Sequence, residues 1–126
     1  GGDRPLVVSY ASSPPAEVIY SEIPINSPPT GVLTDTCFRQ IEFAGIVNGA
    51  DNQESAEALV DFMLSKRFQE DIPNSMLMFP ASVNAELPQI FSEFAEVVET
   101  PYMLDPEFIE ENRNDWTERW TEIVLR

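Results

Sequence analysis

The chain has 126 residues, of which 22 are acidic and 7 are basic, so its formal net charge is −15. This length suits one compact unit or part of a larger one, and it argues against two full domains. Such an acidic chain opposes binding to nucleic acid or to anionic lipid, because both are recognised by clustered Lys and Arg. The absence of histidine excludes a Ser-His-Asp triad, a Cys-His pair and a His-ligated zinc site within this chain.

The single cysteine, Cys37, has no partner for an internal disulfide, so cysteine content does not fix the redox compartment. No stretch approaches the roughly 18 unbroken apolar residues of a membrane helix. The first residues, 1–4, contain no initiating Met, no basic region and no apolar signal core. We therefore expect the sequence to be mature or truncated at its front.

The N-terminal third predicts strand, short helix, loop and strand. Residues 5–10 form a β-branched and aromatic run that ends in a Ser-Pro turn, which is typical of a buried strand. Ser13 is placed to cap a short helix with Pro14 at its first position. A proline-rich loop is expected over 23–31. A second strand is expected in the first part of 32–47, although Phe38 breaks the strict alternation of apolar and polar side chains.

The clearest helix begins near Asp51, whose spacing to Glu54 is that of a capping box. Apolar side chains then recur at helical spacing and form one stripe. They are Ala56, Leu59, Val60, Met63 and Leu64. The helical region is expected to extend to about residue 71, through a second short helix that ends before Pro73.

A second clear helix is predicted over 106–124, with Asp105 as its cap and Pro106 at its first position. Its apolar side chains are expected to form a buried stripe that consists of Ile109, Trp116, Trp120, Ile123 and Val124. The intervening residues 74–104 are expected to be irregular, apart from one short helix within 87–95.

Most of the potentially reactive groups have a structural explanation. Four carboxylates share one face of the last helix, whereas a glycosidase needs two that face each other across a cleft, so a solvated face explains them better. They are Glu107, Glu110, Glu111 and Asp115. The chain has neither a calcium-binding loop nor a glycine-rich phosphate loop. Cys37 has no neighbouring base and is expected to be buried and inert.

One turn carries a signal for ligand binding. In the stretch from Tyr10 to Pro15, an aromatic ring and two hydroxyls stand where a predicted strand meets a predicted helix. Ligands commonly bind at that edge of an α/β sheet, and the backbone N–H groups of a helix start suit anions or polar ligand atoms. An ordinary capped turn would contain the same residue types, so the pattern leaves both explanations open.

Three stretches resemble one known family. The first is the Ser-Tyr-x-x-Ser-Pro motif within 5–14, the second is Cys-Phe-Arg-Gln at 37–40 with the helix over 56–68, and the third comprises 72–80 and 104–120. In order and spacing they resemble the C-terminal part of the thiamine-binding receptors of ABC transporters. Those receptors are periplasmic solute-binding proteins of the type II class.

The resemblance implies an α/β fold, namely the C-terminal portion of a two-lobed periplasmic binding protein type II fold with the ligand in the cleft between the lobes. Residues 1–126 would be a C-terminal fragment with hinge-region strands near 5–10 and 36–44, followed by packed helices near 51–71 and 106–124. The implied protein is not an enzyme. It lies in the periplasm or another extracytoplasmic space and works with a membrane permease and with the missing N-terminal part of its parent. Lipid anchoring of that parent is left open.

The resemblance also implies a site. Tyr10 would contact the thiamine, with the hydroxyls of Ser12 and Ser13 lining the same cleft. Some family members have a second tyrosine where this chain has Ala16, and a tryptophan where it has Leu77. Tyr20 lies one helical turn after Ala16 and is placed to replace the missing ring. The expected ligand is thiamine or a thiamine phosphate, and no cofactor or metal is implied.

Three alternatives remain, one within the class of solute receptors and two in other classes of function. A receptor for iron(III) or another small solute is one, although iron-binding relatives commonly use adjacent tyrosines, which this chain lacks. A hydrolase that uses Ser12 or Ser13 is opposed by the absence of histidine and by the single lysine, Lys66. An acidic interaction module predicts neither a bound ligand nor turnover.

Overall fold

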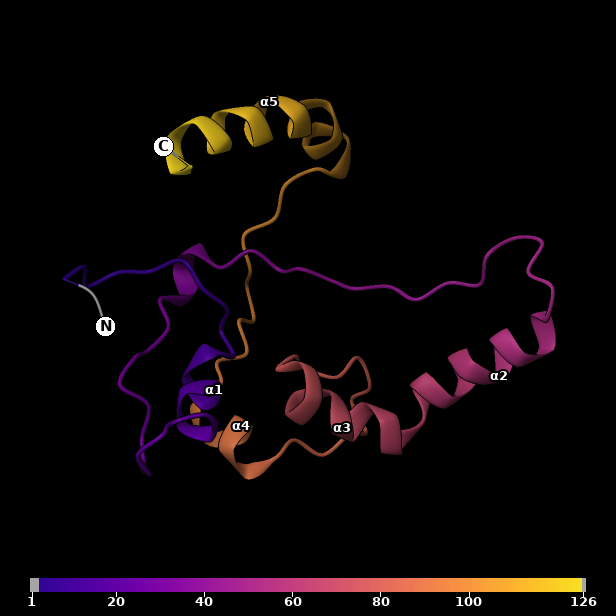
Figure 1. Ribbon diagram of the computed structural model, residues 1–126, viewed down its shortest axis with the longest axis horizontal. Helices are drawn as coiled ribbons and strands as arrows, with labels where there is room; N and C mark the ends of the chain where they lie inside the picture. Colours follow the sequence, from indigo (N-terminus) through magenta and orange to yellow (C-terminus); the bar gives the residue numbers. More distant parts are fainter. Residues whose placement is uncertain (1–2, 126) are drawn as a thin grey trace.

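The computed structural model describes residues 3–125, in which helices are joined by long extended segments (Figure 1). The helices are α1 (Ser13–Ile19), η1 (Thr34–Thr36, a 3-10 turn), α2 (Gln53–Leu64), α3 (Lys66–Met76), α4 (Gln89–Phe94) and α5 (Pro106–Val124). No strand forms within the described residues, where an isolated parallel bridge pairs Phe38 with Tyr102.

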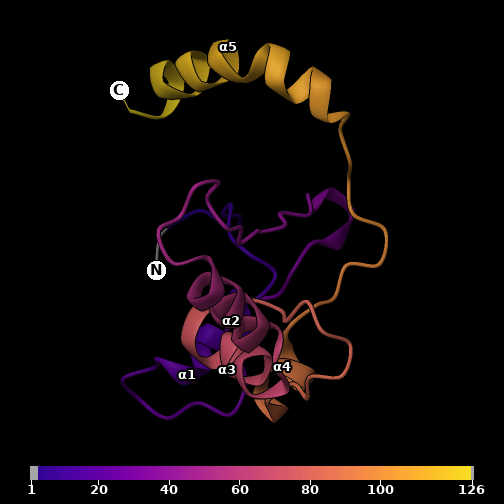
Figure 2. The same ribbon diagram turned by 90° about the vertical axis from the view of Figure 1, so that its right-hand side faces the viewer.

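The elements lie in three layers, which both views show (Figures 1 and 2). Helices α1 to α4 lie on one side, where α1 packs against α4 and α2 against α3. The extended segment that precedes α1 and the extended segment that follows η1 lie in the middle. Helix α5 lies alone on the other side, at the end of an extended connection.

The packed core is small and belongs to the helical layer. Phe91 of α4 is completely buried, and the ring of Phe79 meets it edge to face with the ring centroids 6.3 Å apart. Pro15 and Pro73 are also fully buried. The described residues expose 10875 Å² of surface, against about 6,800 Å² for a compact monomer of this mass. Much apolar surface therefore has no cover.

The expectation of strands at 5–10 and 36–44 is wrong for the described residues. Both stretches are extended, but Val8 is fully exposed and Phe43 is 90% exposed. The main contact of the second stretch is at its start, where the Tyr102 N–H donates to the Cys37 carbonyl at 2.7 Å. A strand is defined by pairing with a neighbour, and these segments have none beyond that bridge. Cys37 is half-buried rather than buried.

Most helix boundaries agree with the capping residues and helix ranges predicted from the sequence, but the N-caps of two helices differ from the prediction. Asp105 caps α5 as predicted, since its carboxylate accepts from the Glu107 N–H at 2.8 Å. Helix α4 lies within the predicted 87–95. However, α2 is capped by Asn52 and not by the predicted Asp51, and α1 begins after Ser12 with no side-chain cap bond.

Helix α3 passes through Pro73, so the prediction that it ends before this proline is wrong. The ring of Pro73 is fully buried, and this burial offsets the loss of a backbone donor within the helix. The helix ends instead at Met76, and its C-cap, Leu77, takes a left-handed conformation with φ of 55°.

The apolar stripe of α5 was predicted to be buried, and this prediction is also wrong. Trp120 is 56% exposed, and Trp116 and Ile123 are exposed as well. Only the ring contact between Phe108 and Trp116, with centroids 5.6 Å apart, covers part of the stripe from within the helix itself. Ile109, Trp116 and Trp120 do line one face of α5, but most of the predicted stripe is exposed in the described part of the chain.

Gln69 of α3 joins three parts of the helical layer. It is 5% exposed, its Nε2 donates to the Met63 carbonyl at 2.8 Å, and its Oε1 accepts from the Ser82 N–H at 3.0 Å. Replacing it would leave a carbonyl and an N–H without partners in a largely buried position, which costs about 1–3 kcal/mol.

We expect Gln69→Ala to lower the free energy of unfolding by that amount. The control is Gln53→Ala, because the Gln53 side chain is exposed and bonds only to Glu57 on its own helix; its effect should stay within about 0.5 kcal/mol. Urea unfolding followed by far-ultraviolet circular dichroism measures both. Equal effects of the two substitutions would contradict this role for Gln69.

Candidate functional site

The predicted ligand-binding residues 10–13 form a tight turn that leads into α1. The Ser13 N–H donates to the Tyr10 carbonyl at 3.0 Å, and the Ser9 and Ser13 hydroxyls lie 2.6 Å apart. The Tyr10 side chain is 72% exposed, whereas Ser12 is only 8% exposed. The Tyr10 ring therefore faces solvent. The Ser12 side chain beside it is largely buried, and the Ser13 hydroxyl is hydrogen-bonded to that of Ser9.

The other two predicted site residues lie at different places in the fold. Tyr20 is the C-cap of α1, so the length of this helix, about 10 Å, separates it from the turn. Leu77 is the half-buried C-cap of α3. Among the described residues, no hydrogen bond or ring contact joins either residue to Tyr10. The structure brings Tyr10, Ser12 and Ser13 together as chain neighbours and leaves Tyr20 and Leu77 apart from them.

The chemistry of this turn suits binding better than catalysis. A serine nucleophile needs a neighbouring base, and the Ser13 hydroxyl is paired with another hydroxyl, that of Ser9. An exposed tyrosine ring, in contrast, offers a π-face to a cationic or aromatic ligand. The loop after α1 is held to the helix by the Thr30 hydroxyl, which donates to Glu17 at 2.7 Å.

Two open hollows occur elsewhere in the described part of the chain. One lies on the exposed face of α5 beside Ile109, Trp116 and Trp120, and the other lies between Phe62 and Asp71 at the α2–α3 junction. None of the predicted site residues lines either hollow. Within residues 3–125, no group of three or more acidic, Cys or His side chains is arranged to hold a metal ion. No helix there has the length and apolarity needed to cross a membrane.

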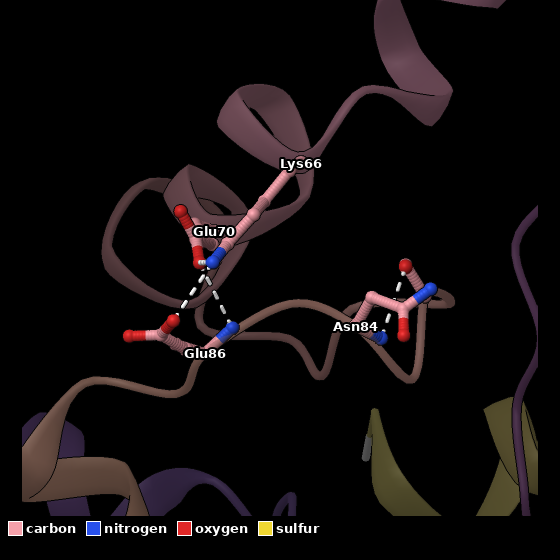
Figure 3. A network of polar contacts seen from close by, with 5 residues as sticks. Lys66, Glu70, Asn84 and Glu86 are labelled. Carbon is pink, nitrogen blue, oxygen red and sulfur yellow. Dashed lines mark hydrogen bonds and ion pairs between the residues drawn. The ribbon is translucent and has the colours of Figure 1, made fainter.

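A polar cluster that the sequence reasoning missed joins α3 to the following loop (Figure 3). The Lys66 ammonium lies 2.7 Å from the Glu86 carboxylate and 3.3 Å from that of Glu70. Glu70 also accepts from the Glu86 N–H at 3.0 Å. The four-residue spacing of Lys66 and Glu70 on one helix was a visible signal, but the sequence offered none for Glu86.

These contacts change the pKa values of two groups. The hydrogen bond and the charge of Lys66 lower the pKa of the Glu86 carboxyl below its ordinary value. The hydrogen bonds to Glu86 and Glu70 raise the pKa of the Lys66 ammonium. Both side chains are largely exposed, and their contacts join α3 to the loop that contains Glu86, so a tether for this loop is what the cluster provides.

The comparisons with known proteins point to one class, the periplasmic binding proteins. No protein-family model and no solved structure matches the chain significantly. The curated relatives are thiamine-binding periplasmic proteins: that of Salmonella typhimurium is 28% identical over 125 residues, that of Escherichia coli 26% over 125, and that of Brucella melitensis 27% over 126. Each match covers 99% of this chain.

The chain spans only 37% of the length of these relatives. The similarity is distant, and it agrees at the level of protein class with the resemblance carried by the sequence motifs. The relatives are named as binding proteins of the periplasm, which fits the expectation of a solute-binding role in an extracytoplasmic space.

The Lys66–Glu86 pair predicts how the stability of the fold and the titration of Glu86 depend on pH. Because the pKa of Glu86 is lowered by folding, the pair stabilises the fold above the ordinary value of 4.5, and this contribution is lost as the pH falls through the lower folded value. Lys66→Met should raise the pKa of Glu86 toward its ordinary value. Arg113→Met is the control, because Arg113 pairs with Glu110 on α5. Titration of the carboxyl carbons by NMR measures both, and an unchanged Glu86 pKa in Lys66→Met would contradict the prediction.

Proposed function

We propose that this chain is the C-terminal part of an extracytoplasmic solute-binding protein that captures thiamine or a thiamine phosphate and delivers it to an ABC transporter permease. The observation that carries the proposal is the match of 99% of the chain to several curated proteins, each called a thiamine-binding periplasmic protein. The contributing residues would be those of the α1 turn. The expected protein binds its ligand and catalyses nothing.

Tyr10 is the proposed main contact. Its ring is exposed at the start of α1, where it is free to lie against the positively charged thiazolium of thiamine, and such a contact contributes about 0.5–2 kcal/mol. Ser12 and Ser13 would supply hydrogen bonds to polar ligand atoms. The net charge of −15 favours the approach of a cation. Tyr20 and Leu77 lie apart from this turn, so they would contact the same ligand only as parts of other walls of the cleft.

The proposed site has one wall within these residues. Small-molecule pockets typically bury about 70–90% of their ligand, whereas the Tyr10 side chain is 72% exposed and lines neither of the two hollows described above. A second wall from a longer polypeptide would complete the cleft. Affinity therefore depends strongly on whether that wall is present.

Calorimetric titration tests the ligand assignment. The 126-residue chain alone should bind thiamine with a dissociation constant of about 1 mM or weaker, because lost contacts weaken binding about tenfold for each 1.4 kcal/mol. A longer polypeptide that includes the second wall should bind thiamine or one of its phosphates much more tightly. Absence of heat with all of these ligands would remove the thiamine assignment. Micromolar binding by the 126-residue chain as a monomer would show instead that the site is complete within it.

A substitution tests the role of Tyr10 within the longer polypeptide. Tyr10→Ala should weaken thiamine binding by about 1–3 kcal/mol and leave the thermal midpoint nearly unchanged, because the ring is exposed. Tyr102→Ala is the matched control: Tyr102 is also an exposed tyrosine, and its bond to Cys37 uses the backbone N–H, which the substitution keeps. If both substitutions weaken binding equally, or if Tyr10→Ala unfolds the protein without changing affinity, Tyr10 is not a ligand contact.

A further inference from the structure

Two distant segments meet where the chain crosses the connection from α4 to α5 (Figures 1 and 2). One segment is 37–39, within the Cys-Phe-Arg-Gln stretch, and the other is 98–102. The Tyr102 N–H donates to the Cys37 carbonyl at 2.7 Å, and Tyr102 also forms the parallel bridge with Phe38. We call this contact the junction. Because its two segments are far apart in the sequence, the junction closes a long loop of the chain.

Arg39 adds a side-chain bond to the junction. Its Nη2 donates to the Val98 carbonyl at 2.5 Å, across 59 positions of the sequence. A hydrogen bond from a charged donor is stronger than one between neutral groups, and a guanidinium does not lose its charge in a protein. Glu96 and Glu99 flank Val98 in the sequence, and their negative charges favour a cation near this carbonyl. The Arg39 bond therefore holds the connection at a point closer to α4 than the Tyr102 bond does.

Both segments of the junction start from the same layer of helices. The connection leaves the end of α4, which packs against α1. On the other side, the Thr30–Glu17 bond fastens the loop after α1 to that helix, and η1 leads from this loop to Cys37. The Cys37 N–H donates to the Thr34 carbonyl at 3.1 Å. The two arms thus leave one layer and meet again, and a closed frame of this kind leaves each arm fewer conformations than a free end has.

The place of α5 depends on this frame, because the connection 95–105 links α5 to the helical layer. In the described residues, no other hydrogen bond joins this connection to the part of the chain before α4. The junction leaves only 95–97 and 103–105 free on its two sides. The root-mean-square span of a flexible chain grows with the square root of its length, from about 10 Å for three residues to about 18 Å for the whole connection. Closing the junction therefore about halves the range over which α5 can move.

We infer that Arg39 is a positioning residue, which closes the junction and thereby sets where α5 lies relative to the helical layer. The inference concerns neither the ligand nor the turn at Tyr10, so it goes beyond the proposed function. The alternative is a solvated arginine without such a role, since the Arg39 side chain is exposed. Its direct bond to a backbone carbonyl in a distant segment favours the positioning role.

Distances between spin labels in the 126-residue chain test this role. Cys37→Ser removes the native thiol and keeps a donor for the Leu33 carbonyl. Labels are then attached through Val83→Cys, in the loop after α3, and Glu118→Cys, on α5, both at exposed positions. Pulsed electron paramagnetic resonance should give one narrow distribution of distances between the two labels. Arg39→Met should widen this distribution about twofold, because the connection is then free over its whole length.

Two variants separate the Arg39 bond from unspecific effects. Arg39→Lys keeps a charged donor and should restore the narrow distribution, which it would not do if any change at this position loosened the chain. Arg4→Met is the matched control, because it changes the net charge by the same amount. Arg4 is exposed and has no hydrogen bond or ion pair within the described residues. The distribution should stay narrow in Arg4→Met.

Hydrogen exchange provides an independent measurement. The Tyr102 amide should exchange about tenfold faster in Arg39→Met, because a hydrogen bond from a charged donor that helps to close the junction is lost. The Gln69 amide is the internal control, since it donates to the Ser65 carbonyl within the helical layer. Its exchange rate should be the same with and without the substitution.

Several results would overturn the inference: a broad distribution in the labelled chain that keeps Arg39, equal widths with and without Arg39→Met, the same widening by Arg4→Met, failure of Arg39→Lys to restore the narrow distribution, or equal acceleration of the Tyr102 and Gln69 amides. None of these measurements uses thiamine. Their outcome is therefore independent of the proposed ligand.

Discussion

An extended backbone must hydrogen-bond to a neighbouring chain or to water, and this requirement determines most features of the structure. The segments around Val8 and Phe43 have the composition of buried strands, yet a strand is stabilised by groups far away in the sequence. Without those groups, the segments remain extended, solvated and exposed. The exposed face of α5 has the same origin, because a helix buries an apolar stripe only when a second layer is present.

The part of the helical layer from α2 to the loop after α3 shows the opposite behaviour, because its polar partners are close in sequence. Gln69 bonds to Met63 and Ser82, and Lys66 reaches Glu70 and Glu86, so each contact joins groups at most 20 residues apart. Closing such short loops costs little entropy, which favours this part of the layer. The packing of α1 against α4 is the exception, since these two helices are far apart in the sequence. The exposed ion pairs add little to the stability of the layer, and the buried amide of Gln69 contributes more.

The same distinction between local and distant contacts explains how far the sequence could predict this molecule. Helix α5 and its Asp105 cap follow from neighbouring residues, and they were predicted correctly. The burial of its stripe and the two strands depend on partners elsewhere, and these predictions failed. Pro73 misled the prediction for α3, because its burial outweighs the missing backbone donor. At the candidate site, only the turn at Tyr10 is local, so its geometry was predictable, whereas the places of Tyr20 and Leu77 relative to it were not.

The proposed ligand contact depends on how the segment 5–10 is held, since Tyr10 is the last residue of this segment. A ring attached to a solvated segment samples many positions, and a ligand that binds it must first restrict that motion, which lowers affinity. When the segment is paired within a sheet, its Cα–Cβ directions are fixed, and the ring is held in place before the ligand arrives. The turn from Tyr10 to Ser13 is already fixed at its helical end by the bond between the Ser13 N–H and the Tyr10 carbonyl. Pairing of the segment 5–10 with a neighbouring strand would fix the other end of the turn. Because the backbone of this segment is unpaired here, the Tyr10 ring has no rigid support for contact with a ligand.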